Sequence, residues 1–178
     1  MKYLREYASD VPGRGKEMAD FFTTLIDTGL RLSEAIGLKW AEVDGEKSIR
    51  LGFDNKGEQP RMVPLTERAA KIIKDRRASR PNSEKRVWPD MTEDRAEYFW
   101  KLVREALKLE DDKDFVIHAC RHTFASRLAM QGVPLNVIKE LGGWKTLDMV
   151  LRYAHLTPEV KEDAIRKMQQ WRKDGTSG

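Results

Sequence analysis

The side chains best suited to chemistry in this sequence lie in one stretch, residues 118–155. This stretch contains all three histidines of the chain, together with Arg121, Trp144 and Tyr153. Because His118 precedes Arg121 by three residues, a helix would place both side chains on one face. A tyrosine hydroxyl has an ordinary pKa of about 10 and needs nearby cations or a base to act as a nucleophile at neutral pH. We interpret Tyr153 as that nucleophile and its neighbours as a site that prepares a phosphate for attack.

Cutting a phosphodiester with a side-chain hydroxyl also requires cations on the non-bridging oxygens and an acid for the departing sugar oxygen. Arginine suits the first task because its planar fork binds phosphate oxygens in pairs and stays charged. Arg31 offers a second fork at the start of a short predicted helix, although Glu34 can equally pair with it there. Lys56, at the tip of a predicted hairpin, is either the acid or an ordinary solvated charge. The indole N–H of Trp144 can donate a hydrogen bond to a phosphate oxygen.

These residues need a frame, and the hydrophobic pattern predicts a mostly helical one. Helices are expected over residues 17–28 and 32–36, after Thr66 and Thr92 as caps, over residues 118–132, from Pro134 to residue 142, around residues 147–151, and from Thr157 onward. Alternation over residues 49–53 and a return over residues 61–63 predict a hairpin, and residues 87–89 predict a short third strand. The expected fold class is α+β, predominantly helical, with a small three-stranded antiparallel sheet.

Length and composition bound the class of protein. A chain of 178 residues can form one domain with its own core. Lys and Arg number 33 against 29 Asp and Glu, and the net charge of +4 permits a polyanionic partner without requiring one. The single cysteine, Cys120, excludes an internal disulfide and gives a structural zinc site no cysteine partner. Because no apolar run reaches membrane-spanning length and no signal peptide opens the chain, we expect a soluble, cytoplasmic protein without a membrane partner.

The most basic segment of the sequence covers residues 68–86, which contain eight Lys and Arg residues and only two acidic residues. Such a segment is either a DNA-facing surface or an exposed helix end and loop. Within it, we take Arg76, Arg77 and Arg80 as the candidates for DNA binding.

Three separate segments resemble the catalytic domain of the tyrosine recombinase, or phage integrase, family. They read T-G-L-R-L-S-E, then K-G-E-Q-P-R-M-V-P-L, then H-A-C-R-H-T-F-A followed by L-G-G-W and R-Y-A-H-L. They occur in the family's order and span roughly residues 20–157, most of the chain. Any one of these motifs recurs by chance, but the set is specific. The sequence departs from the family pattern at Ala119 and Cys120, where many members read Asp-Leu, and this position is non-catalytic.

The resemblance implies a role for each candidate residue. Tyr153 would attack a DNA phosphate, form a 3′-phosphotyrosyl link and free a 5′-hydroxyl, which requires no metal and no cofactor. Arg31, Arg121 and Trp144 would stabilise the transition state, although most members have His at the position of Trp144. Glu34 would support Arg31, and His118 would help to take the tyrosine proton. Lys56 would protonate the leaving oxygen. The implied function is site-specific recombination at a double-stranded DNA site, carried out in the full-length protein by a homo-oligomer, a tetramer on DNA.

The resemblance also suggests how the chain is divided. We expect residues 1–16 to be a linker, residues 17–173 to be the catalytic domain and residues 174–178 to be a flexible tail. We also expect the N-terminal DNA-binding domain common in the family to be absent, in which case the chain should bind DNA weakly and with strong salt dependence. An apolar stripe on the last predicted helix can dock in cis or in trans; its members are Val160, Ala164, Met168 and Trp171.

Other interpretations remain open. Residues 129–142 look like a helix-turn-helix, which would make the chain a non-catalytic DNA-binding protein but would leave the arginine, lysine and tyrosine candidates unexplained. A type IB topoisomerase-like enzyme that relaxes DNA would share the chemistry, and an inactive integrase remnant would share the fold. His118 and His122 can also pair as metal ligands, but the sequence offers no credible third ligand. His122 is better interpreted as a buried, hydrogen-bonded histidine near the site.

Overall fold

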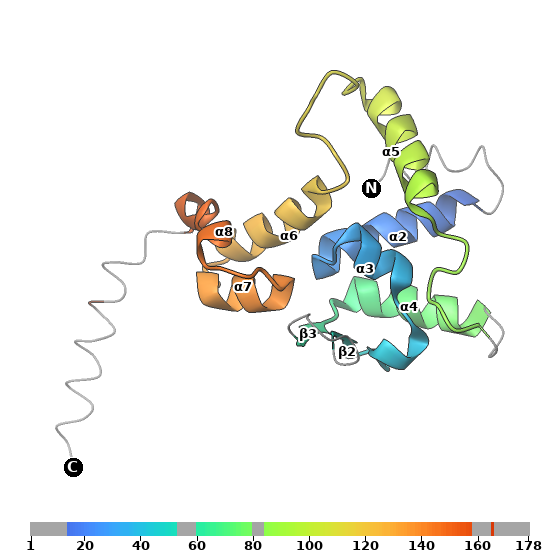
Figure 1. Cartoon of the computed structure of the whole chain (residues 1–178), viewed down its shortest axis with the longest axis horizontal. Helices are drawn as coiled ribbons and strands as arrows, with labels where there is room; N and C mark the ends of the chain where they lie inside the picture. Colours follow the sequence, from blue (N-terminus) through green and yellow to red (C-terminus); the bar gives the residue numbers. More distant parts are fainter. Residues whose placement is uncertain (1–13, 53–59, 80–83, 158–164, 166–178) are drawn as a thin grey trace, which may run out of the picture.

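The computed structural model describes residues 14–52, 60–79, 84–157 and 165 (Figure 1). Its helices are α2 (Arg14–Thr28), α3 (Leu32–Gly37), α4 (Glu67–Ser79), α5 (Glu93–Leu107), α6 (Ala119–Met130), α7 (Leu135–Gly142) and α8 (Asp148–Leu151), with two short 3-10 helices, η2 (Trp40–Glu42) and η3 (Ala154–Leu156). Within these described ranges, strands β1 (Val43–Asp44), β2 (Ser48–Leu51) and β3 (Arg61–Pro64) form one antiparallel sheet in the order β1-β2-β3. The predicted fold class is confirmed.

Helix α2 lies at the centre of the larger hydrophobic core, as its apolar periodicity predicts. Phe21 and Phe22 are both 0% exposed, and their rings meet Trp88 and Trp100 at centroid distances of 5.2 and 5.1 Å. Burial of side chains this large contributes about 1.5–3 kcal/mol each, so these contacts hold α2 against α5 and the segment before it. The helix begins at Arg14, inside the segment that the sequence suggested was a linker.

Two threonine caps begin the next long helices where the sequence predicts them. The Thr66 hydroxyl accepts a hydrogen bond from the backbone N–H of Ala69 at 3.1 Å and donates to Asp27 at 2.9 Å. The Thr92 side chain accepts from the backbone N–H of Arg95 at 3.2 Å. Each cap satisfies an N–H group that the first turn of a helix leaves without a partner, which fixes the starts of α4 and α5.

The sheet confirms the predicted hairpin and corrects the predicted third strand. Ile49 of β2 pairs with Val63 of β3, and both are buried. The third strand is β1, not residues 87–89. Val87 is fully buried, and its backbone N–H donates to the carbonyl of Leu38 at 2.9 Å as part of an isolated antiparallel bridge between Lys39 and Arg86, outside the three strands of the sheet. Burial rather than sheet pairing therefore explains the apolar character of residues 87–89.

Helices α6, α7 and α8 lie together at one side of the molecule (Figure 1). They enclose a second, smaller core whose buried members are Ala125, Ala129, Ile138, Trp144, Val150 and Tyr153. The smaller core meets the larger core at the C-terminal end of α2. Gly29 has a φ of +64°, and a Cβ there would lie 2.3 Å from Cδ1 of Phe124 on α6. Glycine therefore permits both the left-handed turn and the close approach of the two groups.

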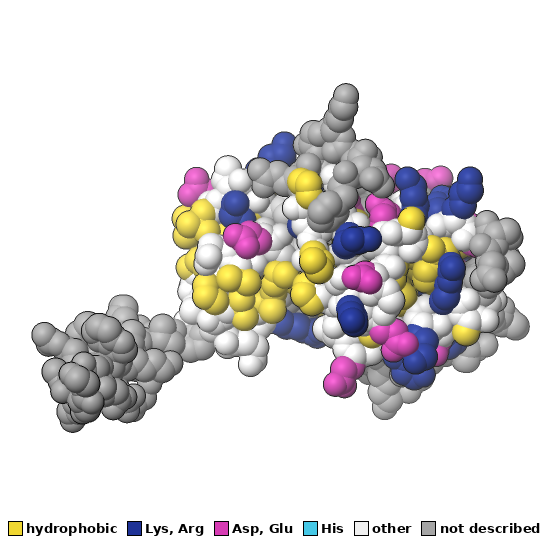
Figure 2. Space-filling model, turned by 90° about the horizontal axis from the view of Figure 1, so that it is seen from below, with side chains coloured by type: hydrophobic (Ala, Val, Ile, Leu, Met, Phe, Trp, Pro, Cys, Tyr) yellow, Lys and Arg dark blue, Asp and Glu magenta, His cyan; other side chains and the backbone are white. Residues whose placement is uncertain are grey.

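Several large apolar side chains of the helices and of the turns between them are exposed. Tyr98 of α5 is 59% exposed, because the buried face of that helix carries Ala96 and Trp100 instead. In the α7–α8 region, Val137, Leu147 and Leu151 are also exposed, and Figure 2 shows hydrophobic side chains gathered over this part of the surface. The predicted last helix and its apolar stripe lie outside the described residues.

Candidate active site

Glu34 of α3 joins two arginines. Its Oε1 accepts a hydrogen bond from Nη1 of Arg31 at 2.7 Å, and its Oε2 accepts from Nη2 of Arg61 at 2.7 Å. The backbone N–H of Arg31 also donates to Oε2 at 2.7 Å, which closes the first turn of α3. Burial alone would raise the pKa of the Glu34 carboxyl, but the hydrogen bonds and charges of Arg61 and Arg31 hold this pKa below its ordinary value. Glu34 is therefore ionised at neutral pH, and its predicted pairing with Arg31 is confirmed.

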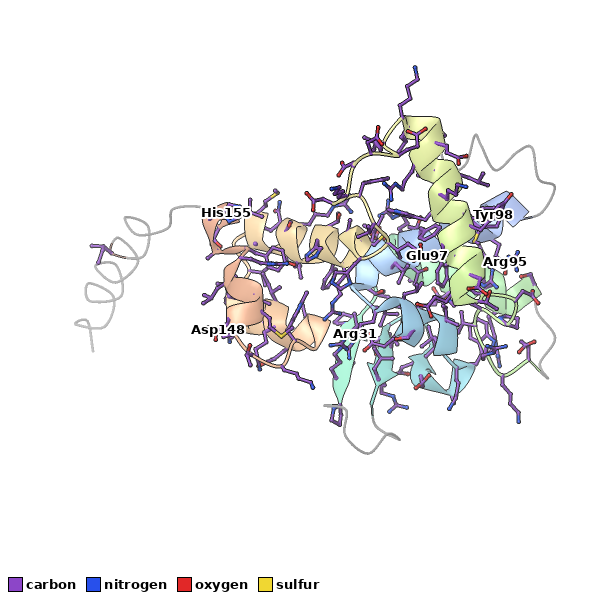
Figure 3. All side chains as sticks on the ribbon, turned by 45° about the horizontal axis from the view of Figure 1, so that its top comes forward. Arg31, Arg95, Glu97, Tyr98, Asp148 and His155 are labelled. Carbon is purple, nitrogen blue, oxygen red and sulfur yellow. The ribbon has the colours of Figure 1, made fainter. Side chains whose placement is uncertain are left out.

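Arg31 also reaches the loop that follows α7. Its Nη2 donates to the backbone carbonyl of Gly143 at 2.8 Å, across 112 positions of sequence. Figure 3 shows Arg31 where the α6–α8 group meets α3 and the sheet. The side chain of Arg31 is 41% exposed, against 8% for Arg61, so Arg31 presents the more accessible of these two positive charges.

Arg121 of α6 is buried at the centre of this junction, with 2% of its surface exposed. Its Nη1 donates to the carbonyl of Gly29 at 2.5 Å, and its Cζ lies 4.0 Å from the centroid of the Trp144 ring. Burial and the positive charge of Arg31 lower the pKa of Arg121 to about 10. The guanidinium therefore remains charged at neutral pH although little water reaches it.

The Trp144 ring depends on the double glycine before it. A Cβ at Gly142 would lie 1.8 Å from Cζ3 of Trp144, so no larger residue fits beneath the ring. Gly143 adopts a φ of +68°, and a Cβ there would lie 2.8 Å from Cζ of Arg61. These glycines let the end of α7 approach both Trp144 and the arginines.

Tyr153 lies directly after α8 and is 4% exposed. Its hydroxyl lies 2.5 Å from Nδ1 of His122, and its ring centroid lies 6.2 Å from that of Trp144. Burial raises the pKa of Tyr153 above its ordinary value, although the positive charges of Arg152 and Arg121 act in the opposite direction. In this conformation the candidate nucleophile is therefore a neutral, sheltered phenol.

His118 lies beside His122, but its side chain lines a hollow and does not contact Tyr153 as His122 does. The two rings meet edge-on, with centroids 4.7 Å apart. His118 and Arg121 line one hollow of about 210 Å³, as their spacing predicts for residues on one helical face. Among the described residues, the histidine hydrogen-bonded to Tyr153 is His122. His122 was expected only as a hydrogen-bonded histidine near the site, without a role, although it directly follows Arg121 on the same helix.

The site carries more positive than negative charge. Among the described residues, three guanidinium groups interact around one carboxylate; they belong to Arg31, Arg61 and Arg121, and the carboxylate to Glu34. Repulsion from the other two arginines contributes to the lowered pKa of Arg121. A bound anion would relieve this repulsion, which makes the cluster suited to a phosphate. Sequence reasoning missed Arg61, although this arginine lies within the second family segment.

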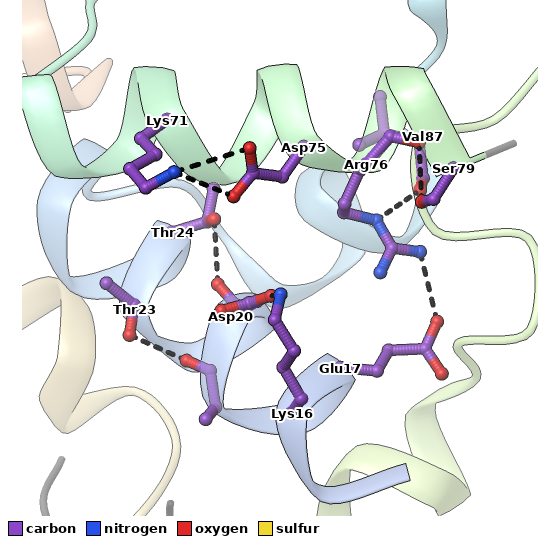
Figure 4. Close-up of polar contacts among 11 residues, drawn as sticks. Lys16, Glu17, Asp20, Thr23, Thr24, Lys71, Asp75, Arg76, Ser79 and Val87 are labelled. Atoms are coloured by element: carbon purple, nitrogen blue, oxygen red, sulfur yellow. Dashed lines mark hydrogen bonds and ion pairs between the residues drawn. The ribbon is translucent and has the colours of Figure 1, made fainter. Parts of the chain in front are cut away.

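The structure corrects one of the DNA-binding candidates. Arg76 is 7% exposed, and it donates to the carbonyl of Val87 at 3.0 Å and to Glu17 at 3.0 Å (Figure 4). Its Cζ lies 3.8 Å from the centroid of the Trp88 ring. These contacts hold it inside the molecule, so it cannot serve as a DNA-facing charge. Arg77, the next residue on α4, is exposed. Lys56 and Arg80 lie outside the described residues.

Two further properties concern the described part of the chain. There, no three or more His, Cys, Asp and Glu side chains come together in a way that could hold a metal ion. Nor does any described helix combine the length and the apolar character needed to cross a bilayer.

Comparison with known proteins agrees with this geometry. Residues 8–159 match the model of the phage integrase family. The chain is 33% identical to the integrase of Salmonella phage P22 over 158 residues, which is 80% of this chain and 40% of that protein. The catalytic domain of bacteriophage HP1 integrase superposes with a TM-score of 0.65 at 28% identity, covering 83% of this chain and 79% of that one. The Tn1549 transposon integrase in complex with transposon right end DNA shares the fold, with a TM-score of 0.67 at 23% identity and coverage of 92% and 63%.

The chain therefore belongs to the phage integrase family of tyrosine recombinases. It spans less than half the length of the P22 integrase. The family match covers both helical groups and the sheet between them, so the arginine cluster and Tyr153 fall within the matched region.

Proposed function

We propose that this chain is the catalytic part of a site-specific recombinase that cuts and rejoins DNA through a 3′-phosphotyrosyl intermediate. The observation that carries the proposal is the position of Tyr153, a buried phenol beside a cluster of arginines with too few carboxylates to neutralise it. The DNA-bound Tn1549 integrase and the identity to phage integrases support a double-stranded DNA substrate. The same support disfavours a non-catalytic helix-turn-helix protein, because phosphate binding alone would need the arginines but not a tyrosine hydroxyl beside them.

In the proposed reaction, the Tyr153 hydroxyl attacks a phosphate held by Arg31 and Arg121, with the Trp144 N–H as a further donor. The bond to phosphorus keeps the energy of the broken phosphodiester, so no ATP is needed. Lys56 protonates the departing 5′-oxygen. Because Tyr153 is 4% exposed, the surface that covers its hydroxyl must open before DNA reaches it.

Rejoining to a second strand requires several active sites on one DNA complex. We therefore propose that the full-length protein acts as a homo-oligomer, a tetramer on DNA, in the cytoplasm. Arg77 and Arg80 are the proposed contacts to the DNA backbone, where Lys and Arg side chains position the duplex without reading its sequence.

The experiment is a covalent trapping assay on nicked duplexes whose sequence is randomised around the nick. The nick lets the cleaved fragment diffuse away, so the protein–DNA adduct accumulates and survives denaturation. Wild-type protein should form the adduct, Tyr153→Phe should not, and Tyr98→Phe should behave as wild type because that side chain is exposed on α5. Absence of an adduct with wild type, or an equal yield from Tyr153→Phe, would refute the proposal. Sequence-independent relaxation of plasmid DNA would instead favour a topoisomerase.

A further inference from the structure

The hydrogen bond between His122 and Tyr153 has no place in the mechanism above. Nδ1 of His122 lies 2.5 Å from the Tyr153 hydroxyl oxygen, and the two ring centroids are 6.1 Å apart. The residues come from α6 and the turn after α8, 31 positions apart in sequence. Local structure does not bring them together, so the contact depends on the packing of the second core.

The chemistry of the two groups sets the direction of this bond. Burial raises the pKa of Tyr153, so the phenol keeps its proton at neutral pH and has one O–H to donate. Burial also lowers the pKa of His122, and the charges of His118, Arg152 and Arg121 lower it further. A neutral imidazole has one acceptor nitrogen, and the geometry assigns that role to Nδ1, which leaves the proton on Nε2.

His118 is less well placed for this task. Its ring lies edge-on to His122 and, together with Arg121, lines the hollow of about 210 Å³ on another side of α6. Of the groups around His122, His118 directly precedes α6 and Arg121 belongs to it, whereas Tyr153 and Arg152 follow α8. A guanidinium has only donor groups, so neither Arg121 nor Arg152 can accept the proton, and His122 is the acceptor in contact with the hydroxyl.

We propose that His122 is a catalytic residue that takes the proton from Tyr153 during DNA cleavage, an inference that rests on the proposed recombinase function. As the Tyr153 oxygen forms its bond to phosphorus, its O–H bond breaks and the proton passes to Nδ1. The bond between phosphorus and the 5′-oxygen breaks in the same step, and that oxygen receives its proton from Lys56. Rejoining reverses both transfers, since the imidazolium returns its proton to Tyr153 as a 5′-hydroxyl attacks the phosphotyrosine.

The test compares His122→Asn with wild type on a nicked duplex recovered from the covalent trapping assay. The asparagine amide can place its oxygen near the position of Nδ1 and keep a hydrogen bond to Tyr153, but it cannot take up the proton. Loss of a general base costs about 100- to 10,000-fold, so the rate of adduct formation should fall by about 100-fold or more. His155→Asn is the matched control and should keep the wild-type rate, because His155 is exposed and makes no contact used in the mechanism.

Two further measurements separate proton acceptance from a structural role. The wild-type rate should fall as the pH drops through the pKa of His122, because the imidazolium has no acceptor nitrogen, and His122→Asn should lack this acidic limb. A duplex with sulfur in place of the bridging 5′-oxygen has a leaving group that needs no acid. It should restore the rate of a Lys56→Ala variant and should not restore that of His122→Asn. A rate for His122→Asn within about 3-fold of wild type, or its rescue by sulfur, would overturn the inference.

A measurement without DNA keeps the inference testable if His122→Asn does not fold. In nitrogen NMR of the wild-type chain, Nδ1 of His122 should be an unprotonated acceptor at neutral pH, and Tyr153→Phe should shift its resonance. An unchanged resonance would overturn the inference. If wild-type protein forms no adduct on any duplex, the proposed function fails and this inference fails with it. If wild type forms the adduct and His122→Asn matches it, this inference alone fails.

Discussion

Replacing Glu34 by glutamine should destabilise the protein by removing the one carboxylate that faces the arginine cluster among the described residues. The side chains of Glu34 and Arg61 are 9% and 8% exposed, so their ion pair is shielded from water. The side chain of Arg31 is 41% exposed, so water screens its pair with Glu34. The substitution Glu34→Gln keeps the shape of the side chain and one acceptor oxygen, but it removes the negative charge and turns an amide group toward a guanidinium.

The magnitude follows from these exposures. Breaking a buried ion pair by removing one partner costs about 3–5 kcal/mol, while an exposed pair is worth about 0–1 kcal/mol. Because glutamine keeps one hydrogen bond, we expect a loss of about 3 kcal/mol in the free energy of unfolding. For a domain of this size, each kcal/mol lowers the melting temperature by about 2–4 °C, so the melting temperature should fall by about 6–12 °C.

The loss of stability in Glu34→Gln should become smaller as the pH falls. The pKa of Glu34 is lowered in the folded state, so its contribution is fully present above the unfolded value near 4.5 and is lost as the pH falls through the folded pKa. The difference between wild type and Glu34→Gln should therefore be constant near neutral pH and should narrow in acid. At low pH the protonated glutamic acid resembles glutamine.

The assay is thermal unfolding followed by circular dichroism over a series of pH values. Glu42→Gln is the matched control, because Glu42 accepts a hydrogen bond from the backbone N–H of Lys39 at 2.8 Å, as Glu34 does from Arg31, but in an exposed setting. The control should change the free energy of unfolding by less than about 1 kcal/mol. If Glu34→Gln is as stable as this control, or if its deficit persists unchanged in acid, the reasoning about the cluster is wrong.

Three further outcomes are expected from the same structure. Gly142→Ala should lower the melting temperature and slow adduct formation, because the added Cβ would lie 1.8 Å from the Trp144 ring that packs against Arg121. The control is Gly37→Ala, whose Cβ would have nothing within 4 Å; it should be neutral or should stabilise the protein by about 0.5–1 kcal/mol. Cys120 is 3% exposed and burial raises the pKa of its thiol to about 12, so a thiol-reactive dye should label the unfolded protein and leave the native protein unlabelled over hours at neutral pH. Arg76→Ala should lower the melting temperature, because Arg76 is buried in α4. Arg77→Ala should instead lower the slope of DNA affinity against salt concentration by about one charge. The opposite pattern would contradict the assignment of Arg76 to the core and of Arg77 to the DNA-facing surface.

Features that depend on neighbours in sequence were predictable without the structure. The apolar periodicity of residues 17–28, the caps at Thr66 and Thr92 and the alternation around Ile49 involve contacts within a few residues, and all appear in the fold. The three-residue spacing of His118 and Arg121 likewise places both on one side at the start of α6, because a helix repeats every 3.6 residues. The family segments identified most of the candidate site for the same reason, since each motif is short and local.

Which of several similar residues enters the site was decided by tertiary packing. Arg76 and Arg77 are adjacent in a basic segment, yet the helix turns them about 100° apart and buries one while exposing the other. His122 meets Tyr153 across 31 positions, and Arg31 meets Gly143 across 112. Local spacing carries no information on such distances, because the free energy that selects these contacts comes from the burial of cores assembled from distant segments. The sequence thus determines the chemical groups and their local faces, and the packing of the two helical groups determines that Tyr153 is sheltered and that His122 is its partner.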